Sequence, residues 1–540
     1  MKRKTLLLYQ IILILSMLLP LSHISIAMPQ VSALQEAQGF YNYTFLVMDN
    51  GTSLIVISFS MKGRPLSKYS SWVYLPRNLT NVKVIVNQGK ILNYTVHPTG
   101  YYFYSQYTFN FTPNENGSFI SQFTYKMNYA ALIIEPEGAF VSPLIRYSPS
   151  SKGEATVIIP DYVELKYFDP IPGLKEKKNN KLILRYLLSP QILRIYLLFK
   201  VNWKPDITNI SVPPFTVITP HRYMSEARAL ISVYSKTYPL IRDIIGIELK
   251  NVTIRLFVPS ELSEFSILGF VPFNPRISKI GEIHLNIFYL RAIKGILEYG
   301  AIHELIHHIL WKLKVMPEVL WVHEGLAEYL GITLVRLIDT NGTFEDGLRW
   351  REKLLNDYVQ RTRGNFNFLL RWRPGVIPVN DVLLCYASAY TIFRTLGDRY
   401  SLSLYKRLFK LIRSLNFPLS SSALFIELLN EAAGEDLSPY FKRWGFNVLR
   451  VSTVLKIAHM LPPLMEDPFN ILKPLAKWGY SIAMDLLEKG LYEKASVWLN
   501  IALIITLLGK AVIFLASTYI VVSLILLLLR GTRKKQIFTK

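Results

Sequence analysis

The chain has 540 residues, of which 51% are hydrophobic and 18% are charged, and its 61 Lys and Arg outnumber its 38 Asp and Glu for a net charge of +23. The high apolar fraction and the length exclude an intrinsically disordered protein and a single small domain. One cysteine, Cys385, excludes an intrachain disulfide framework and a multi-cysteine zinc or iron–sulfur site. The charge alone does not distinguish a nucleic-acid partner from a membrane or from no partner.

The N-terminus has the pattern of a secretory signal peptide. Basic residues at positions 2–4 precede an uncharged apolar run from Leu6 to about Leu21, and the small residues at 31–33 (VSA) form a cleavage signal. We therefore predict a signal peptide over residues 1–33. An uncleaved membrane anchor is the alternative, because the apolar run is long for a signal.

Residues 34–205 predict a β-sandwich-like domain, because strand-length runs recur there without helical periodicity. Two pairs of runs flank Asn50-Gly51 and Asn116-Gly117, and Asn-Gly is the strongest short hairpin signal. The segment 175–181 (KEKKNNK) predicts a solvated loop. The runs are residues 42–48, 53–61, 101–111, 119–127, 155–159 and 182–187.

A proline-rich stretch at 205–220 marks a boundary, after which strands are followed by helices. This order predicts an α+β domain over residues 206–450. The expected strands are 252–258 and an edge-like strand over 281–288 (GEIHLNIF). The expected helices are residues 225–245, 290–314, 318–337, 353–363 and 387–412.

The C-terminal part predicts a helical segment over residues 451–510. Within it, helices over 478–489 and 493–508 surround a turn at 490–492, and their small residues at helical spacing predict a tetratricopeptide-like hairpin. One hairpin cannot bury its own apolar face, so we expect it to pack on the preceding domain or on a membrane surface.

Residues 511–529 are uncharged and apolar, and at about 1.5 Å per residue they are long enough to cross a hydrocarbon core of about 30 Å. The basic tail at 530–540 predicts a cytoplasmic C-terminus. We therefore expect a single-pass cell-membrane protein with most of the chain outside the cytoplasm. Glycosylation sequons fit such an ectodomain, at Asn42, Asn50, Asn78, Asn93, Asn110, Asn116, Asn209, Asn251 and Asn341. Nucleic-acid binding is not expected, because the basic residues form no recognisable module.

The segment HELIH carries two histidines at helical spacing. His303 and His307 are at i and i+4, so both project from one helix face and can share one zinc ion at about 2.0–2.1 Å. Glu304 lies about 100° round the helix, where it can reach a water at the metal. This H-E-x-x-H pattern is typical of a zinc metalloprotease with Glu304 as general base. The alternative is a helix with two satisfied core histidines.

A catalytic zinc site needs a third protein ligand and an open position. The segment WVHEGLAEY at 321–329 offers Glu324, which lies on the next predicted helix and can fold back towards the two histidines. Glu328 is one turn further on the same face, where it could accept the outer N–H of a ligating histidine. The alternative for both glutamates is an exposed helix face.

Together, HELIH and WVHEGLAEY resemble the gluzincin branch of the zinc peptidases, in the peptidase MA superfamily, and are most similar to the aminopeptidase N family. The resemblance covers about residues 215–450. It implies a thermolysin-like α+β catalytic domain and one Zn²⁺ held by His303, His307 and Glu324. It also implies Glu304 as the base and a peptide or protein as the substrate.

The resemblance further implies a tyrosine whose hydroxyl supports the oxyanion. Tyr386 is the candidate, in a segment (LLCYASAYTIFRTLG) whose start resembles the family's Y-x-K-G-type helix, with Ser388 in place of the lysine and Ala389 in place of the glycine. Tyr390 and a plain core tyrosine are the alternatives. Cys385 is expected in the core and not as a nucleophile.

The family's G-x-M-E-N strand is missing, since the strand GEIHLN carries Glu282, His284 and Asn286. Exopeptidase and endopeptidase activity therefore both stay open, and His308 and His323 match no family role. The expected function is a membrane-anchored extracytoplasmic zinc metallopeptidase. The alternative is a non-catalytic cell-surface or adhesion protein with a peptidase-like fold. The sequence does not indicate an oligomeric state.

Overall fold

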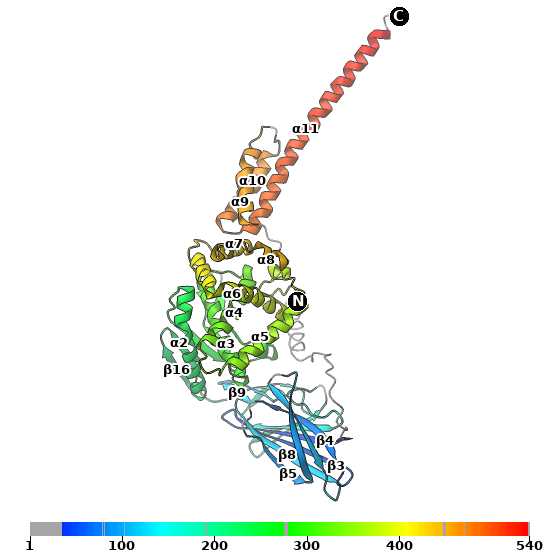
Figure 1. Ribbon diagram of the computed structural model, residues 1–540, viewed down its shortest axis with the longest axis vertical. Helices are drawn as coiled ribbons and strands as arrows, with labels where there is room; N and C mark the ends of the chain where they lie inside the picture. Colours follow the sequence, from blue (N-terminus) through cyan, green and yellow to red (C-terminus); the bar gives the residue numbers. More distant parts are fainter. Residues whose placement is uncertain are drawn as a thin grey trace. The chain divides into compact units, whose positions relative to one another are not determined.

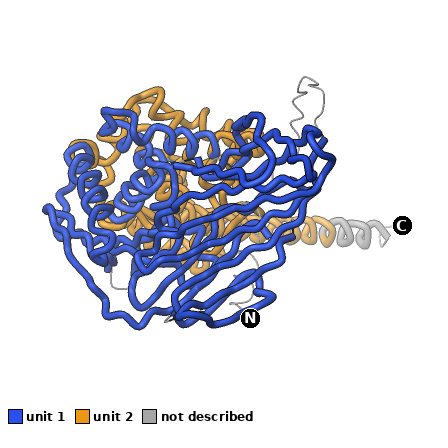
Figure 2. The backbone as a smooth tube through the Cα atoms, turned by 90° about the horizontal axis from the view of Figure 1, so that it is seen from below, with its two compact units in different colours: residues 1–241, 247–308, 327–354 blue, residues 242–246, 309–326, 355–540 orange. Residues whose placement is uncertain are grey.

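The computed structural model describes residues 35–537 except 78, 80, 102, 162, 190–191, 275–278, 447–449 and 469, and describes side chains up to residue 527. The predicted signal peptide and the side chains of the predicted basic tail lie outside this part. The chain is a multidomain mixed α/β protein with two compact units (Figures 1 and 2). Unit 1 contains residues up to 241, 247–308 and 327–354, and unit 2 contains residues 242–246, 309–326 and 355–540.

The N-terminal part of unit 1 is rich in strands, as predicted (Figure 1). A seven-stranded sheet has the order β13-β14-β11-β2-β3-β8-β5, and two four-stranded sheets have the orders β1-β4-β7-β6 and β12-β15-β10-β9. The strands are β1 Gln35–Glu36, β2 Phe40–Val47, β3 Ser53–Lys62, β4 Tyr69–Pro76, β5 Lys83–Gln88, β6 Lys90–Pro98, β7 Tyr104–Thr112, β8 Ser118–Met127, β9 Ala131–Ile134, β10 Glu137–Val141, β11 Lys152–Pro160, β12 Glu164–Asp169, β13 Leu174–Lys178, β14 Lys181–Leu188 and β15 Tyr196–Lys200.

Alternating side chains of these strands form one hydrophobic core. In β3 every second residue is buried, and Phe59 from this strand contacts Phe109 and Phe111 of β7. The rings of Phe111 and Phe119 are 3.9 Å apart. Because β3 and β7 belong to different sheets, this core joins the seven-stranded sheet to a four-stranded one.

The two Asn-Gly turns have different outcomes. The hairpin predicted at Asn50-Gly51 is confirmed, since β2 and β3 are antiparallel with Val47 opposite Ser53. The hairpin predicted at Asn116-Gly117 is wrong, because β7 and β8 belong to different sheets. The turn contacts another loop, where Gly63 N–H donates to the Gly117 carbonyl at 2.8 Å. Turn chemistry predicts a reversal of the chain but not which strand pairs after it.

The solvated loop predicted over 175–181 is also wrong, because most of it forms β13, which pairs with β14 at one edge of the large sheet. Its residues are largely exposed. Lysines on an edge strand hinder pairing with other chains, so a charged sequence here is compatible with a strand.

The remaining part of unit 1 contains a five-stranded sheet with the order β16-β17-β18-β22-β19. Its strands are β16 Ile207–Val212, β17 Phe215–Pro220, β18 Val252–Phe257, β19 Gly269–Phe270 and β22 Ile283–Asn286, and a small hairpin pairs β20 Phe273–Asn274 with β21 Lys279–Ile280. The helix α2, Met224–Ile245, follows β17 as predicted. The predicted edge strand is wrong: β22 is internal, and the outer strand is β19, which is too short to show periodicity.

The next three helices are α3, Ile296–Lys312, α4, Leu320–Ile338, and α5, Glu345–Val359. The first two match the predicted helices, although residues 287–291 form a separate short 3₁₀ helix, η3. The helix α5 begins well before the predicted residue 353, because its charged first turns lack apolar periodicity. Both α3 and α4 contain residues of the two units.

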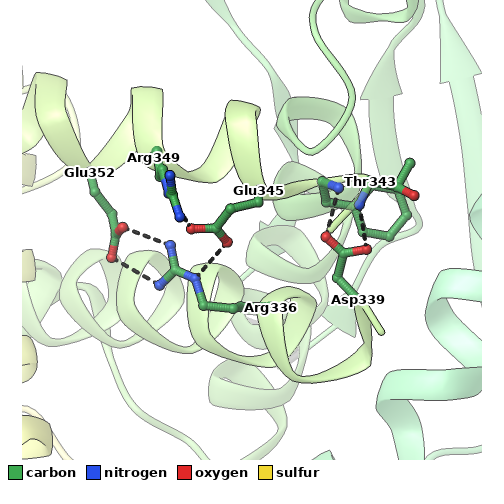
Figure 3. A network of polar contacts seen from close by, with 7 residues as sticks. Arg336, Asp339, Thr343, Glu345, Arg349 and Glu352 are labelled. Atoms are coloured by element: carbon green, nitrogen blue, oxygen red, sulfur yellow. Dashed lines mark hydrogen bonds and ion pairs between the residues drawn. The ribbon is translucent and has the colours of Figure 1, made fainter. Parts of the chain in front are cut away.

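Charged side chains join α4 to α5 (Figure 3). Arg336 of α4 donates to Glu345 at 3.0 Å and to both carboxylate oxygens of Glu352. Asp339, just after α4, accepts the backbone N–H groups of Thr343 and residue 344. These contacts connect the chain on both sides of the turn between the two helices.

Unit 2 is helical. Its main helices are α6 Val382–Arg413, α7 Ser422–Ala433, α8 Ser438–Arg443, α9 Val451–Met465, α10 Lys473–Glu488 and α11 Tyr492–Ile537. The two predicted helices are present as α10 and the start of α11, with Ala483, Ala495 and Ala502 buried, and their likeness to a tetratricopeptide hairpin stays a prediction. The second helix does not stop at residue 508 but continues through the predicted membrane span. Among the described residues, one helix is long and apolar enough to cross a membrane, over Tyr492–Leu527.

Candidate metal centre

The structure brings the three predicted ligands together. His303 and His307 lie on α3 and Glu324 lies on α4, and one ligand atom from each is within 4.8 Å of the others. The Nε2 atoms of the two histidines are 3.0 Å apart. His303 and Glu324 are 7% and 9% exposed. The alternative of an exposed helix face is therefore wrong for Glu324.

The donor set fits a zinc ion. One ion at about 2.0–2.1 Å from each donor needs donor separations of about 3.3 Å in a tetrahedral site. The nitrogen pair is close to this value, and the carboxylate oxygen lies at most about 1.5 Å too far. Two imidazoles and one carboxylate form a set that zinc favours, and three protein ligands leave one position open.

Helix α3 is buried for most of its length, as its apolar flanks predicted. Ala301, Ile302, Leu305 and Ile306 are fully buried. Lys314 and Pro317 follow the helix, and Lys314 has a left-handed backbone conformation with φ of 57°, so the chain turns before α4 begins. This connection allows Glu324 on α4 to face the histidines on α3.

Glu304 lies against the outer strand of the five-stranded sheet. Its side chain is so close to Gly269 of β19 that a Cβ atom there would lie 2.7 Å from Glu304 Cγ. Glu304 is 5% exposed. On α2, burial and then the Glu304 charge raise the pKa of Tyr234 well above its usual value. The carboxylate that is predicted to be the base thus lies at a sheet edge, next to a residue without a side chain.

Glu328 is held by an arginine that the sequence analysis did not single out. Arg351 of α5 donates to Glu328 through both Nε, at 3.2 Å, and Nη2. The Glu328 side chain is fully buried, so the exposed-face alternative is wrong for this residue too. The hydrogen bond to Glu328 from a ligating histidine stays a prediction.

Arg351 also contacts the helix that carries the histidines. Its guanidinium lies 5.6 Å from the centre of the Tyr299 ring, and Tyr299 meets His303 edge-on with ring centres 5.7 Å apart. Tyr299 is one turn before His303 on α3, and Glu328 is one turn after Glu324 on α4. Arg351 of α5 thus contacts Tyr299 on α3 and Glu328 on α4. Each of these two residues lies one helical turn from a candidate metal ligand.

The two histidines without a family role lie nearby in the sequence. His323 is fully buried, with Nε2 2.7 Å from the Val315 carbonyl oxygen and its ring 4.1 Å from that of Trp311. It therefore joins α4 to the chain segment that follows α3. His308 is half-buried on α3 and is not part of the metal-ligand group.

The candidate tyrosines lie one turn apart on α6. Tyr386 is half-buried with its ring against Trp372, whereas Tyr390 is 1% exposed. That the hydroxyl of Tyr386 or of Tyr390 supports an oxyanion stays a prediction. Cys385 is buried, and burial raises the pKa of its thiol to about 12, so the predicted core position is confirmed and the thiolate is disfavoured at neutral pH.

Three neighbours of the site were missed by sequence reasoning, namely Gly269, Tyr299 and Arg351. Gly269 lies in a strand of two residues, and Arg351 lies on the exposed-looking helix α5, so neither has a local pattern that marks it. Tyr299 does have a signal, because it precedes His303 by one turn of the same helix.

Comparison with known proteins does not identify this site. A comparison of the chain with protein-family models and with curated proteins found no match. The assignment of the site therefore depends on its own residues, which form a His-His-Glu donor group beside a buried glutamate on a helical scaffold.

Proposed function

We propose that the chain is a zinc-dependent metallopeptidase of the gluzincin type, with a thermolysin-like catalytic domain. The observation that carries this proposal is the group of His303, His307 and Glu324, whose ligand atoms are within 4.8 Å of one another. These three residues would hold the metal. When bound, zinc supplies Lewis-acid polarisation of a carbonyl oxygen and lowers the pKa of water.

Glu304 is the proposed general base. Its place one residue after His303 keeps it out of the ligand group but next to it, so its carboxylate can accept a proton from water that attacks the peptide carbonyl. Glu304 is 5% exposed, so its carboxylate has little contact with bulk water. Tyr386, or Tyr390, is the proposed donor to the developing oxyanion.

The sheet edge supports an extended peptide as the substrate. Within the described part of the chain, β19 pairs with β22 on one side only. An extended peptide can pair with the free side of such a strand through main-chain hydrogen bonds. Gly269 has no side chain, so a peptide there can approach the Glu304 carboxylate closely.

The metal and the base are tested on the full chain in detergent. We expect about one zinc per chain by elemental analysis, with loss of the metal in His303→Ala and Glu324→Gln. Glu304→Gln should retain zinc and lose peptide hydrolysis by about 10²–10⁴-fold. Glu298→Gln, on the same helix but outside the ligand group, is the control and should retain both. A peptide mixture with free and blocked N-termini distinguishes exopeptidase from endopeptidase activity.

Two results would contradict the proposal. If Glu304→Gln hydrolyses peptides as fast as the wild type, Glu304 is not the base. If the wild type binds zinc but cleaves no peptide, the non-catalytic surface protein is favoured.

We also propose a single-pass topology with the peptidase outside the cytoplasm. The apolar helix α11 and the predicted basic tail support it. In intact cells, an impermeant thiol reagent should label a cysteine introduced at the exposed Lys175 but not one at Lys535. Cys385 is buried and contributes no background. Equal labelling of both positions would contradict the topology.

A further inference from the structure

Two arginines from distant parts of the sequence meet in unit 1. Arg194 precedes β15 and Arg291 ends η3. Arg194 Nη1 donates to the Ser142 carbonyl at 2.9 Å, and Arg291 Nη1 donates to the Val141 carbonyl at 2.8 Å. The carbonyl groups of two consecutive residues therefore hold the two guanidinium groups.

The same tyrosine lies beside both arginines. Tyr104 is 5% exposed, its ring centre is 5.4 Å from Arg194 Cζ, and its hydroxyl accepts the Leu144 N–H at 3.0 Å. Burial acts to raise the pKa of Tyr104, but the charges of Arg194 and Arg291 outweigh it, so the pKa is lowered from its ordinary value. Both positive charges thus act on one hydroxyl group.

Among the residues that the structure describes, no acidic side chain neutralises this pair. Within the described part of the chain, neither guanidinium forms an ion pair with a carboxylate. The nearest acidic group along the sheet is Asp169, which lies opposite Tyr196 in β15. Burial raises the pKa of Asp169 and neither arginine lowers it, so this carboxylate is not their partner.

Two like charges in a half-buried place are unfavourable without a counter-charge. Burial, and then the charge of Arg194, lower the pKa of Arg291 to about 10, so this side chain is still cationic at neutral pH. A guanidinium has five N–H donors. Each of these two donates through Nη1 to a carbonyl oxygen. In addition, Arg194 hydrogen-bonds the Tyr104 hydroxyl, and Arg291 Nη2 lies 3.7 Å from Met127 Sδ. Among the described residues the two positive charges therefore have no carboxylate partner, and each guanidinium has more N–H donors than these contacts use.

We propose that Arg194, Arg291 and Tyr104 form a binding site for an oxyanion, either a carboxylate or a phosphate- or sulfate-type group. A guanidinium matches the geometry of such anions through paired N–H donors. The Tyr104 hydroxyl already accepts a hydrogen bond from Leu144 and can donate its own proton to the anion. The site contains none of the proposed metal ligands, so the proposal is independent of the peptidase assignment.

The test is calorimetric titration of the full chain in detergent at neutral pH and constant ionic strength. Bound metal is first removed with a chelator, and the chelator is then dialysed away, so that neither a metal nor the chelator's own carboxylates interfere with anion binding. Inorganic phosphate, sulfate, acetate and an N-blocked peptide with a free carboxylate are titrated separately, which distinguishes the sources of the oxyanion. We expect saturable binding of at least one of them at one site per chain.

Lysine variants locate the site. Arg194→Lys and Arg291→Lys keep the charge but lose the paired donors, so the affinity should fall at least about tenfold. Tyr104→Phe keeps the ring and removes only the hydroxyl, and it should weaken binding by about five- to tenfold. This variant locates the site even if the lysine variants do not fold. Arg185→Lys is the control, since Arg185 is 57% exposed and paired with Glu176, and its affinity should equal that of the wild type.

Three results would overturn the proposal. The first is the absence of saturable binding of all four anions to the wild type. The second is wild-type affinity in every folded variant at Arg194, Arg291 and Tyr104. The third is tyrosinate absorption at neutral pH that disappears in Tyr104→Phe, because an ionised Tyr104 would itself supply the counter-charge.

Discussion

Replacing Arg351 by methionine should destabilise the protein far more than the same change at Arg349 on the same helix. The Arg351 side chain is 15% exposed and pairs with Glu328, which is fully buried. The Arg349 side chain is 73% exposed and pairs with Glu345 one turn away, at 2.7 Å. The two arginines thus differ mainly in the burial of their ion pairs.

The expected magnitudes follow from this difference. Removing one partner of a buried pair leaves an uncompensated charge and costs about 3–5 kcal/mol. An exposed pair at i and i+4 contributes only about 0.3–0.5 kcal/mol. Because 1 kcal/mol shifts Tm by about 2–4 °C in a domain of 150–250 residues, Arg351→Met should lower Tm by roughly 6–20 °C and Arg349→Met by at most about 2 °C.

Thermal unfolding of the full chain in detergent, with a chelator present, measures both variants without a contribution from bound metal. The double variant Arg351→Met, Glu328→Met should recover most of the loss, because an apolar pair can replace a buried ion pair at little cost. Equal Tm values for the two single variants would refute the reasoning, and so would a double variant no more stable than Arg351→Met alone.

Gly269→Ala should lower the free energy of unfolding by about 1–3 kcal/mol and slow peptide hydrolysis, because the new Cβ would lie 2.7 Å from both Glu304 Cγ and the His284 carbonyl oxygen. Gly100→Ala is the control, because no atom lies within 4 Å of a Cβ placed there. If both variants changed Tm and the rate of hydrolysis equally, the close contact between Gly269 and Glu304 would be contradicted. Cys385 should react with thiol reagents near pH 8 only after denaturation, since burial raises its pKa to about 12. Because the folded thiol keeps its proton, Cys385 makes the free energy of unfolding fall as the pH rises above about 8.5, the ordinary pKa of a cysteine thiol. Fast labelling of Cys385 in the native protein would contradict its burial and its raised pKa.

The candidate ligands were predictable because helical periodicity is local. His303 and His307 are one turn apart, so their shared face follows from helix geometry once an apolar sequence makes α3 a helix. The hairpin of α10 and α11 is predictable for the same reason, since its buried alanines recur at helical spacing. The first Asn-Gly turn between β2 and β3 is another local signal that the structure confirms.

Other features depend on pairing between segments distant in the sequence. Nothing near Asn116-Gly117 indicates that β7 and β8 join different sheets. No pattern around Gly281 indicates that β22 is internal and that the two residues of β19 form the edge beside Glu304. Strand neighbours are chosen by the packing of whole sheets, which local propensity does not encode.

The pairing of His303 with His307 on one helix face follows from the amino-acid sequence, because the spacing of residues on a helix is a property of a few consecutive turns. The approach of Glu324, from a second helix, could only be predicted as possible. The surroundings of these residues depend on how distant elements pack. The pairing of Arg351 with Glu328, the contact of Gly269 with Glu304 and the meeting of Arg194 with Arg291 all join segments from different elements. Such contacts arise when burial of apolar surface brings distant elements together, and charged side chains then find partners that no neighbouring residue predicts.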